Sequence, residues 1–309
     1  MELKFSDEKK IFNTHTDGIP YLSFDMLDRL GVPNLYTTRF VSYNDELGTG
    51  ETGLRLCVMK GDVLSEAAPH VLEMRSRLAE QLGSSIDMEY ITDQKHTNYV
   101  NVVREEDLGP LWPEEKPLHR QYVDGMVTDI PGVLLTVFGG DCPSVYIVDP
   151  VKKCAGLVHA GWKGTLGKIP EVAISRMTLE FGCEPADMYA TIGPGICRDC
   201  YEMGDEVYDA FASEWSAADA EKIFSKYALN RDAIDSGRAT CTDIEAARGW
   251  KYHLDLRAAN KMTLLRAGVP TDHIAVSNVC TMCNVDTFYS YRAHRMENEQ
   301  CAMLVNRFE

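Results

Sequence analysis

Cys142 and His159 are residue types that can do chemistry together if the fold brings them close. A histidine beside a cysteine can activate the thiolate as a nucleophile. Thiolate and imidazole are also favoured ligands of zinc. His96, at the end of a strand-like run, would be a third ligand and would favour the metal. Its spacing matches no local zinc motif, so two ordinary histidines and a buried cysteine remain an alternative.

A predicted hairpin would position this pair. The apolar runs Ser144–Val148 and Ala155–Val158 are separated by Asp149–Lys153, which has turn chemistry and is too short for a helical crossover. We therefore expect two antiparallel strands. With the turn centred near Val151, residues whose numbers sum to about 301 face each other, so Cys142 would lie across from His159. Directly opposed residues have Cβ atoms about 5 Å apart. A slip of one residue would place the two side chains on opposite faces of the sheet.

Helical and strand patterns occur along much of the chain, which predicts one mixed domain. The polar segments Glu105–Arg120 and Asp232–Trp250 are typical of surface excursions. Apolar spacing, Pro170 at a helix start and glycines at helix ends predict helices at 69–82, 170–181, 205–214 and 255–267. Runs rich in Val, Ile, Leu and Tyr predict strands at 133–138, 144–148, 155–159, 188–192 and 273–277.

The composition limits the classes of partner. Hydrophobic residues make up 45% of the 309 residues, as in soluble globular proteins. The formal net charge of -16 and the lack of a basic run argue against nucleic acid and anionic membranes as partners. The N-terminal residues show no signal-peptide pattern, so we expect a cytoplasmic protein. Its oligomeric state is not indicated.

Two Cys-x-x-Cys pairs, Cys197/Cys200 and Cys280/Cys283, stand out among the ten cysteines. Such pairs bind zinc when two of them lie at ribbon spacing. Here the pairs are much farther apart in sequence. In a reducing compartment we expect buried or free thiols, with a second metal or a redox pair as the alternatives.

Several blocks together resemble the YfiH or laccase-domain family, also called the multicopper polyphenol oxidase family. The most specific is His159-Ala160-Gly161-Trp162 combined with Asp141-Cys142. The other matching blocks, in consistent order over roughly residues 35 to 306, are Thr37–Arg39, Gln94–His96, Asp124–Thr128, Ile192–Ile196, Cys200–Met203, Asp255–Asn260, Cys280–Thr281 and Phe288–Arg292.

The resemblance implies a fold, a metal and an activity. The family fold is a layered α/β/β/α single domain with mixed and antiparallel sheets, here spanning 1–309 with an N-terminal extension of about 1–34. Family members bind one zinc through two histidines and a cysteine, which correspond to His96, Cys142 and His159. They are described as phosphorylases of adenosine, inosine, guanosine and methylthioadenosine that also deaminate adenosine. The implied partners are therefore small purine nucleosides, with phosphate as co-substrate.

Three further residues are candidates for binding substrate. Lys163 and the backbone amides before the helix at Pro170 can hold phosphate, and Arg39 can add a bidentate contact. Asp141 precedes the cysteine and can orient an imidazole or form a turn. Lys163 stands where the family commonly has Arg, and such departures affect substrate preference, not the three metal ligands.

Three rival functions remain open. A copper-dependent polyphenol oxidase follows from the family's other name, but none of the eight histidines forms the His-x-His pairs of multicopper sites, although copper can replace zinc in a site with cysteine. A metal-free hydrolase would use Cys142 as nucleophile and His159 as base. A zinc-stabilised scaffold would have no turnover and would unfold without its metal.

Overall fold

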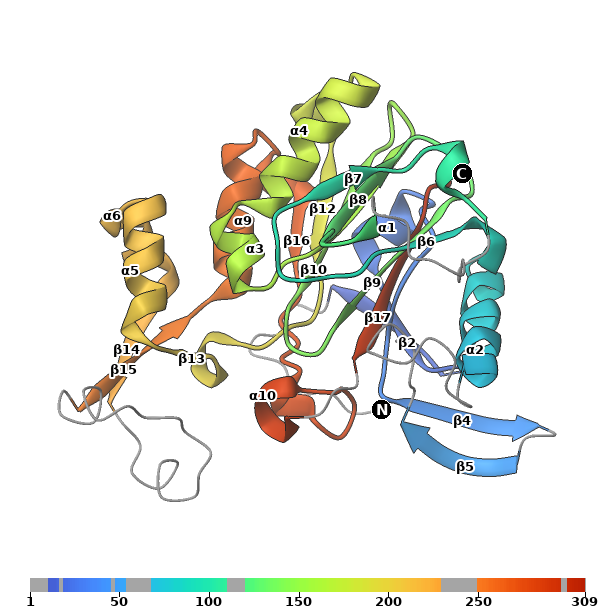
Figure 1. The fold of residues 1–309 in the computed structure, drawn as a ribbon, viewed down its shortest axis with the longest axis horizontal. Coiled ribbons are helices and arrows are strands. Elements are labelled where there is room, and N and C mark those ends of the chain that lie inside the picture. Colours follow the sequence, from blue (N-terminus) through green and yellow to red (C-terminus); the bar gives the residue numbers. More distant parts are fainter. Residues whose placement is uncertain are drawn as a thin grey trace.

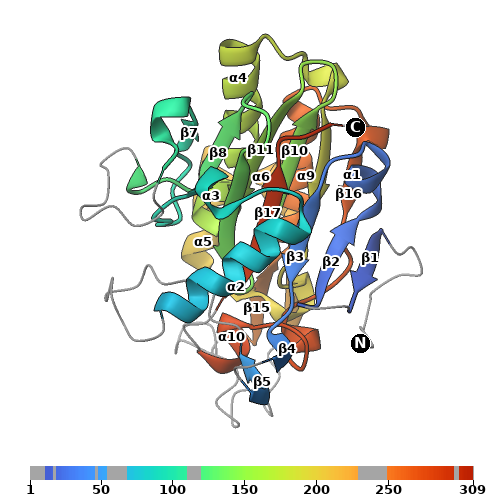
Figure 2. The same cartoon turned by 90° about the vertical axis from the view of Figure 1, so that its right-hand side faces the viewer.

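Two six-stranded sheets pack face to face, with helices on the outer face of each (Figure 1, Figure 2). The structure is a computed structural model that describes residues 11–16, 19–45, 48–53, 68–109, 120–228, 249–295 and 299–308. The layered α/β/β/α arrangement with mixed and antiparallel sheets, predicted from the resemblance, is confirmed.

The first sheet joins the two ends of the chain. Strand β17 (Gln300–Val305) lies in its middle, antiparallel to β3 (Asn34–Thr37) and to β9 (Leu134–Gly139). Beyond β3 the sheet continues into β2 (Tyr21–Phe24) and β1 (Phe12–His15). Strand β6 (Glu89–Ile91) runs parallel to β9 at the other edge. The segment expected as an N-terminal extension therefore contributes strands to this sheet.

The second sheet carries the predicted hairpin. Strands β10 (Ser144–Asp149) and β11 (Cys154–His159) pair in antiparallel fashion at its centre. Next to β10 lie β12 (Tyr189–Ile192) and then β16 (Ile274–Val276), and next to β11 lie β8 (Gly125–Thr128) and then β7 (Val100–Val102). The outer pairs β12–β16 and β7–β8 are parallel, so the sheet is mixed.

The predicted register of this hairpin is wrong by two residues. His159 pairs with Ser144 and not with Cys142, because the turn closes slightly later than the middle of Asp149–Lys153. A shift of two residues preserves the face on which each side chain lies. Its consequence is that Cys142 lies just before β10, in the turn that joins β9 to β10.

A continuous apolar core fills the space between the sheets. Leu135 and Leu304 of the first sheet belong to one buried cluster with Tyr146 and Leu157 of the second. Alternate residues of the same strands, such as Leu134 and Val158, pack outward against helices. Strands buried on both faces consist of nearly continuous apolar residues, which explains why the sequence predicted them well.

The helices cover the outer faces and begin and end where the sequence predicted. Helix α2 (Ala68–Gln81) packs on the first sheet. Helices α4 (Ile169–Phe181) and α9 (Leu256–Arg266) pack on the second. Helix α4 has Pro170 in its first turn and ends at Gly182, whose φ of 66° suits glycine. All four predicted helices are confirmed, α5 (Asp205–Glu214) being the fourth.

The remaining elements are short and lie around the ends of the sheets. They are α1 (Asp25–Arg29), α3 (Trp162–Leu166), α6 (Ala217–Ile223), α10 (Tyr291–His294), the hairpin β4 (Phe40–Asp45) with β5 (Gly48–Gly53), and a small sheet of β13 (Glu202–Met203), β15 (Trp250–Leu254) and β14 (Phe224–Ala228). Residues 110–119 and 229–248, which hold most of the two predicted excursions, lie outside the described residues. No helix in the described part of the chain has the length and hydropathy needed to cross a bilayer.

Candidate active site

His96, Cys142 and His159 lie together at one end of the second sheet, although three separate segments supply them. His96 follows β6, Cys142 lies in the β9–β10 turn, and His159 ends β11. Cys142 Sγ is 3.9 Å from His96 Nε2, and the two imidazole ring centroids are 4.9 Å apart. One potential ligand atom from each residue lies within 4.8 Å of the other two, a spacing that a single metal ion can bridge.

Asp124 orients His159. Its Oδ1 lies 2.8 Å from His159 Nδ1, and both side chains are buried. With the Nδ1 proton donated to the carboxylate, the lone pair of Nε2 is available to a metal or to a thiol proton. The sequence suggested Asp141 for this orienting role, with a turn as the alternative. Asp124 is not among the residues predicted for the site, although it begins one of the blocks that carry the family resemblance.

The same carboxylate also shapes the loop that carries His96. Three consecutive backbone amides, those of Lys95, His96 and Thr97, donate to Asp124 at 3.0, 2.9 and 2.8 Å. His96 has a φ of 61°, and this left-handed turn allows the amides to converge on one anion. Burial alone would raise the pKa of Asp124, but hydrogen bonding and charge from His159, together with these amides, lower it to about 2.

Asp141 holds the turn that presents Cys142. Its φ of 135° is unusual for a residue with a side chain and costs on the order of 1–3 kcal/mol. Its carboxylate accepts hydrogen bonds from Thr281 Oγ1 at 2.6 Å and from the Arg292 amide at 2.7 Å. Burial raises the pKa of Asp141 above its ordinary value, although these hydrogen bonds oppose the shift. Asp141 thus forms the turn that was the alternative to orienting an imidazole.

Gly161 allows His96 and Cys142 to approach each other. A Cβ atom at this position would lie 2.7 Å from His96 Cδ2 and 3.0 Å from Cys142 Sγ. Both distances are well inside van der Waals contact. The glycine of the His-Ala-Gly-Trp block therefore leaves space that any other side chain would fill.

The electrostatics of the pair favour a thiolate at Cys142. Burial alone would raise the pKa of this thiol, but the charge of His159 and hydrogen bonds with His159 and His96 lower it to about 7. Burial would likewise lower the pKa of His159, but the Cys142 charge and the Asp124 hydrogen bond raise it to about 10. A thiolate is both the nucleophile of a Cys/His hydrolase and a metal ligand, so this result leaves both chemistries open.

The three residues line a cavity of about 470 Å³, a size typical of small-molecule sites. Its lining combines aromatic rings with cationic groups, and Asp141 is part of it. The other lining residues are Gly140, Trp162, Tyr201, Met203, Tyr291, Arg292, Arg295 and Glu299. The sequence analysis did not identify the two arginines, although Arg292 ends the matching block Phe288–Arg292.

The two cations predicted to bind phosphate lie outside this lining. The Arg39 guanidinium donates to the Val285 carbonyl at 2.6 Å. Lys163 is exposed, with its ammonium 5.6 Å from the centroid of the Trp162 ring. The segment predicted to offer free amides forms the five-residue helix α3, which is separated from the end of β11 by two residues.

The chain is similar in sequence to proteins that are named as enzymes of purine nucleosides. An adenosine deaminase named RL5, from an unknown prokaryotic organism, is 33% identical over 241 residues, which is 78% of this chain and 82% of RL5. The purine nucleoside phosphorylase YlmD of Bacillus subtilis strain 168 is 32% identical over 222 residues, which is 72% of each chain.

Comparison with solved structures and with family models gives the same relationship. The crystal structure of YlmD from Geobacillus stearothermophilus superposes with a TM-score of 0.72 and 27% identity, covering 97% of this chain and all of that one. The family described as multi-copper polyphenol oxidoreductase laccase matches residues 59–306. The chain is therefore a member of the multi-copper polyphenol oxidoreductase laccase family, the YfiH family that its sequence blocks resemble.

Proposed function

We propose that the protein is a zinc-dependent purine nucleoside phosphorylase that also deaminates adenosine. The observation that carries the proposal is the convergence of His96, Cys142 and His159 on a cavity lined by aromatic rings and arginines. The names of the relatives, purine nucleoside phosphorylase and adenosine deaminase, support the same substrate class.

The donor set fits zinc. One thiolate and two imidazoles are preferred zinc ligands, and Asp124 supplies the hydrogen bond that fixes the orientation of His159. Zinc held by three protein ligands supplies a Lewis acid and lowers the pKa of water at its open position. His96, Cys142 and His159 would hold the ion, and Asp124 would keep the proton on His159 Nδ1.

The lining of the cavity suits a nucleoside and phosphate. Trp162, Tyr201 and Tyr291 offer ring faces for stacking a purine. Arg292 and Arg295 offer guanidinium donors to a phosphate anion. In phosphorolysis a phosphate oxygen bonds to C1′ of the ribose while the bond from C1′ to the base nitrogen breaks, and the purine leaves with a proton. Donors fixed beside the phosphate stabilise this transition state.

In this proposal Arg292 binds the phosphate, because other contacts already fix the position of its guanidinium group. Its Nη1 donates to the Glu202 carbonyl at 2.9 Å, and its Cζ lies 5.1 Å from the centroid of the Tyr201 ring. A guanidinium fixed in this way loses little further entropy when it binds an anion. Arg39 and Lys163, the cations proposed from the sequence, would contribute only through longer-range attraction.

Copper oxidation and metal-free hydrolysis are the competing functions. The family name favours the first, since copper binds the same donors as zinc. The low pKa of Cys142 favours the second. Treatment with a chelator distinguishes these two functions. A copper oxidase would lose its activity with its metal, whereas a metal-free hydrolase would keep its activity and would lose it only on thiol alkylation.

A product assay tests the proposal. The purified protein is incubated with adenosine, with and without phosphate, and adenine, inosine and hypoxanthine are separated by chromatography. Cys142→Ala is run beside the wild type, with Cys154→Ala as the control that removes a buried thiol outside the site. We expect adenine only when phosphate is present, inosine with or without it, and neither product from Cys142→Ala.

Two results would contradict the proposal. Products that persist in Cys142→Ala would show that the three-residue site is not the reaction centre. A wild-type protein that contains zinc but converts no purine nucleoside would favour the alternative of a zinc-stabilised scaffold without enzymatic activity.

A further inference from the structure

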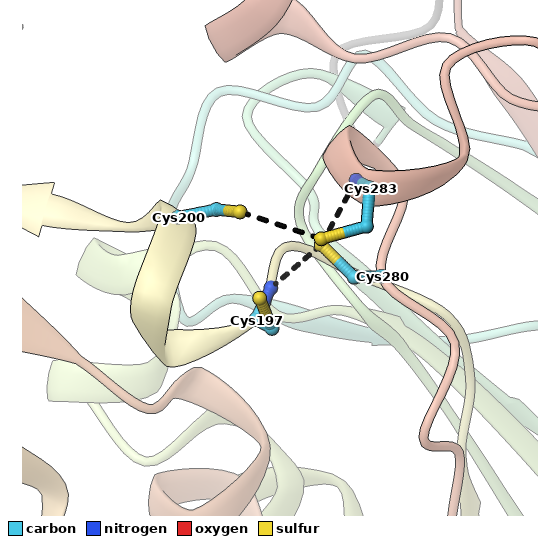
Figure 3. Close-up of side chains that lie close together, drawn as sticks. All are labelled: Cys197, Cys200, Cys280 and Cys283. Atoms are coloured by element: carbon cyan, nitrogen blue, oxygen red, sulfur yellow. Dashed lines mark hydrogen bonds between the residues drawn. The ribbon is translucent and has the colours of Figure 1, made fainter. Parts of the chain in front are cut away.

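The four cysteines of the two Cys-x-x-Cys pairs form one cluster that shares no residue with the three-residue site (Figure 3). Cys197 and Cys200 flank the 3₁₀ turn Arg198–Cys200. Cys280 and Cys283 belong to the second segment, around the 3₁₀ turn Met282–Asn284. The four Sγ atoms all lie within 4.8 Å of one another. The sequence analysis expected separate buried or free thiols, because the two pairs are distant in the chain.

The sulfur spacing fits a tetrahedral metal better than disulfides. Zinc–sulfur bonds of about 2.3 Å place the sulfurs of a tetrahedral site about 3.8 Å apart. Cys200 Sγ and Cys283 Sγ, which come from different segments, are 3.6 Å apart. A disulfide needs about 2.05 Å. All four described thiols are unbridged, and a small inward movement would let one ion contact all four.

Two backbone amides point at the sulfur of Cys280, as amides do at the sulfur of a thiolate ligand. The amides of Cys197 and Cys283 lie 3.2 and 3.4 Å from Cys280 Sγ, one from each segment (Figure 3). Donors of this kind offset the negative charge that thiolates bring to a metal site. Cys280 is buried and Cys283 is exposed, so the cluster has a sheltered centre and one side open for loading.

We propose that Cys197, Cys200, Cys280 and Cys283 bind a structural zinc ion. Four protein thiolates fill the tetrahedron, so this site has no open position, in contrast to the three-residue site. Loading releases the thiol protons to solvent as the four zinc–sulfur bonds form.

This zinc would join two segments that build the wall of the cavity. Tyr201, a lining residue, directly follows Cys200. Thr281, directly after Cys280, donates to Asp141 beside Cys142. The backbone bonds between these segments are long, at 3.3 Å for Gly195 N to Val279 O and for Thr281 N to Gly195 O. A metal cross-link would therefore add substantially to their association.

Metal analysis of the full chain tests the site. The wild type and three variants, Cys283→Ser, Cys142→Ala and Cys154→Ser, are purified under reducing conditions, and zinc is counted per chain by native mass spectrometry. We expect two zinc ions in the wild type and in the buried-thiol control Cys154→Ser. Cys283→Ser and Cys142→Ala should each lose one.

X-ray absorption at the zinc edge identifies the atoms bound to zinc. It is measured on Cys142→Ala, so the test holds even if Cys283→Ser does not fold. In Cys142→Ala, the remaining zinc should show four sulfur neighbours at about 2.3 Å. Nitrogen neighbours on that zinc, no zinc in Cys142→Ala, or disulfides among these four cysteines would each overturn the proposal. The test also separates this proposal from the proposed function. If the wild type binds one zinc ion and only Cys283→Ser loses it, the four-thiol site is supported. The zinc ion of the proposed function is then contradicted.

Discussion

Gly161→Ala should weaken metal binding at the three-residue site without disturbing the fold. The added methyl group would lie 2.7 Å from His96 Cδ2 and 3.0 Å from Cys142 Sγ. Gly161 has φ of -66° and ψ of 168°, which alanine adopts easily. Backbone strain therefore contributes little, and the effect comes from pressing the methyl group against two of the proposed ligands.

The size of the effect follows from the overlap. Carbon atoms in contact prefer separations of about 3.5–4.0 Å, so the methyl group would overlap His96 by about 1 Å. Overpacking of this kind costs about 1–3 kcal/mol. Because the displaced groups are two of the proposed ligands, most of this cost should fall on the metal complex. The expected loss in zinc affinity is therefore roughly 5- to 150-fold, at about 1.4 kcal/mol for each factor of ten.

The assay is competition for zinc against a chromophoric chelator, with unfolding by urea measured in parallel. Gly156→Ala is the matched control, since it adds a methyl group in β11, the strand that ends at His159. Its Cβ would meet Val127 at 3.1 Å and no proposed ligand. The control should lower stability and leave zinc affinity unchanged.

A Gly161→Ala protein that binds zinc as tightly as the wild type would refute the reasoning. It would mean that His96 and Cys142 need not be as close as they are here, or that one of them is not a ligand. Equal losses of affinity in Gly161→Ala and Gly156→Ala would refute it too, because the effect would then belong to the fold and not to the site.

Three further predictions concern the orientation of His159, a buried ion pair between α2 and β6, and the lining of the cavity. Asp124→Ala should lower zinc affinity by about 10- to 100-fold, since it removes the partner of His159, and an unchanged affinity in the same competition assay would contradict that role. Glu89→Leu should lower the free energy of unfolding by about 3–5 kcal/mol, because it removes the carboxylate that lies 2.7 Å from the Arg75 guanidinium in a fully buried ion pair. The control Glu73→Gln breaks an exposed pair and should change stability by at most about 1 kcal/mol in urea unfolding. Tyr291→Ala, at a side chain 54% exposed, should raise KM for adenosine by roughly fivefold if it stacks on the base, since one stacked ring contributes about 1 kcal/mol or more; an unchanged KM would place the base elsewhere.

The layers of the fold were predictable because they depend on short-range patterns. Strands such as 144–149 are buried on both faces, and their central residues form a continuous apolar run. Pro170 and Gly182 mark the two ends of α4 for reasons of backbone geometry alone. The hairpin register was missed by two residues because a five-residue linker can close in several ways, and hydrophobic alternation does not distinguish registers that differ by two.

The details of the site depend on contacts between distant segments, which the sequence does not encode locally. Asp124 meets the His96 loop only because β8 begins beside the end of β11. Arg292 replaces Arg39 as the cation at the cavity because the C-terminal segment folds back against the Asp141 turn. The four cysteines form one cluster although their two pairs lie far apart in the chain, a distance that no local motif spans.

The two proposed metal sites are connected through hydrogen bonds to Asp141. Ile196, directly before Cys197, donates its amide to the Asp141 carbonyl at 2.8 Å. Thr281 lies between Cys280 and Cys283, and its hydroxyl donates to Asp141 at 2.6 Å, next to Cys142. The strained backbone of Asp141 depends on such support, so loosening the four-thiol cluster should loosen the Cys142 turn. Thermodynamic linkage requires the effect to be mutual: zinc at either site should strengthen binding at the other by the same factor. A hydrogen bond to a charged group contributes at most about 3 kcal/mol, so the part of this factor that the Thr281 bond carries should not exceed roughly 150. Unequal factors in Cys283→Ser and Cys142→Ala would show that one substitution acts beyond this connection.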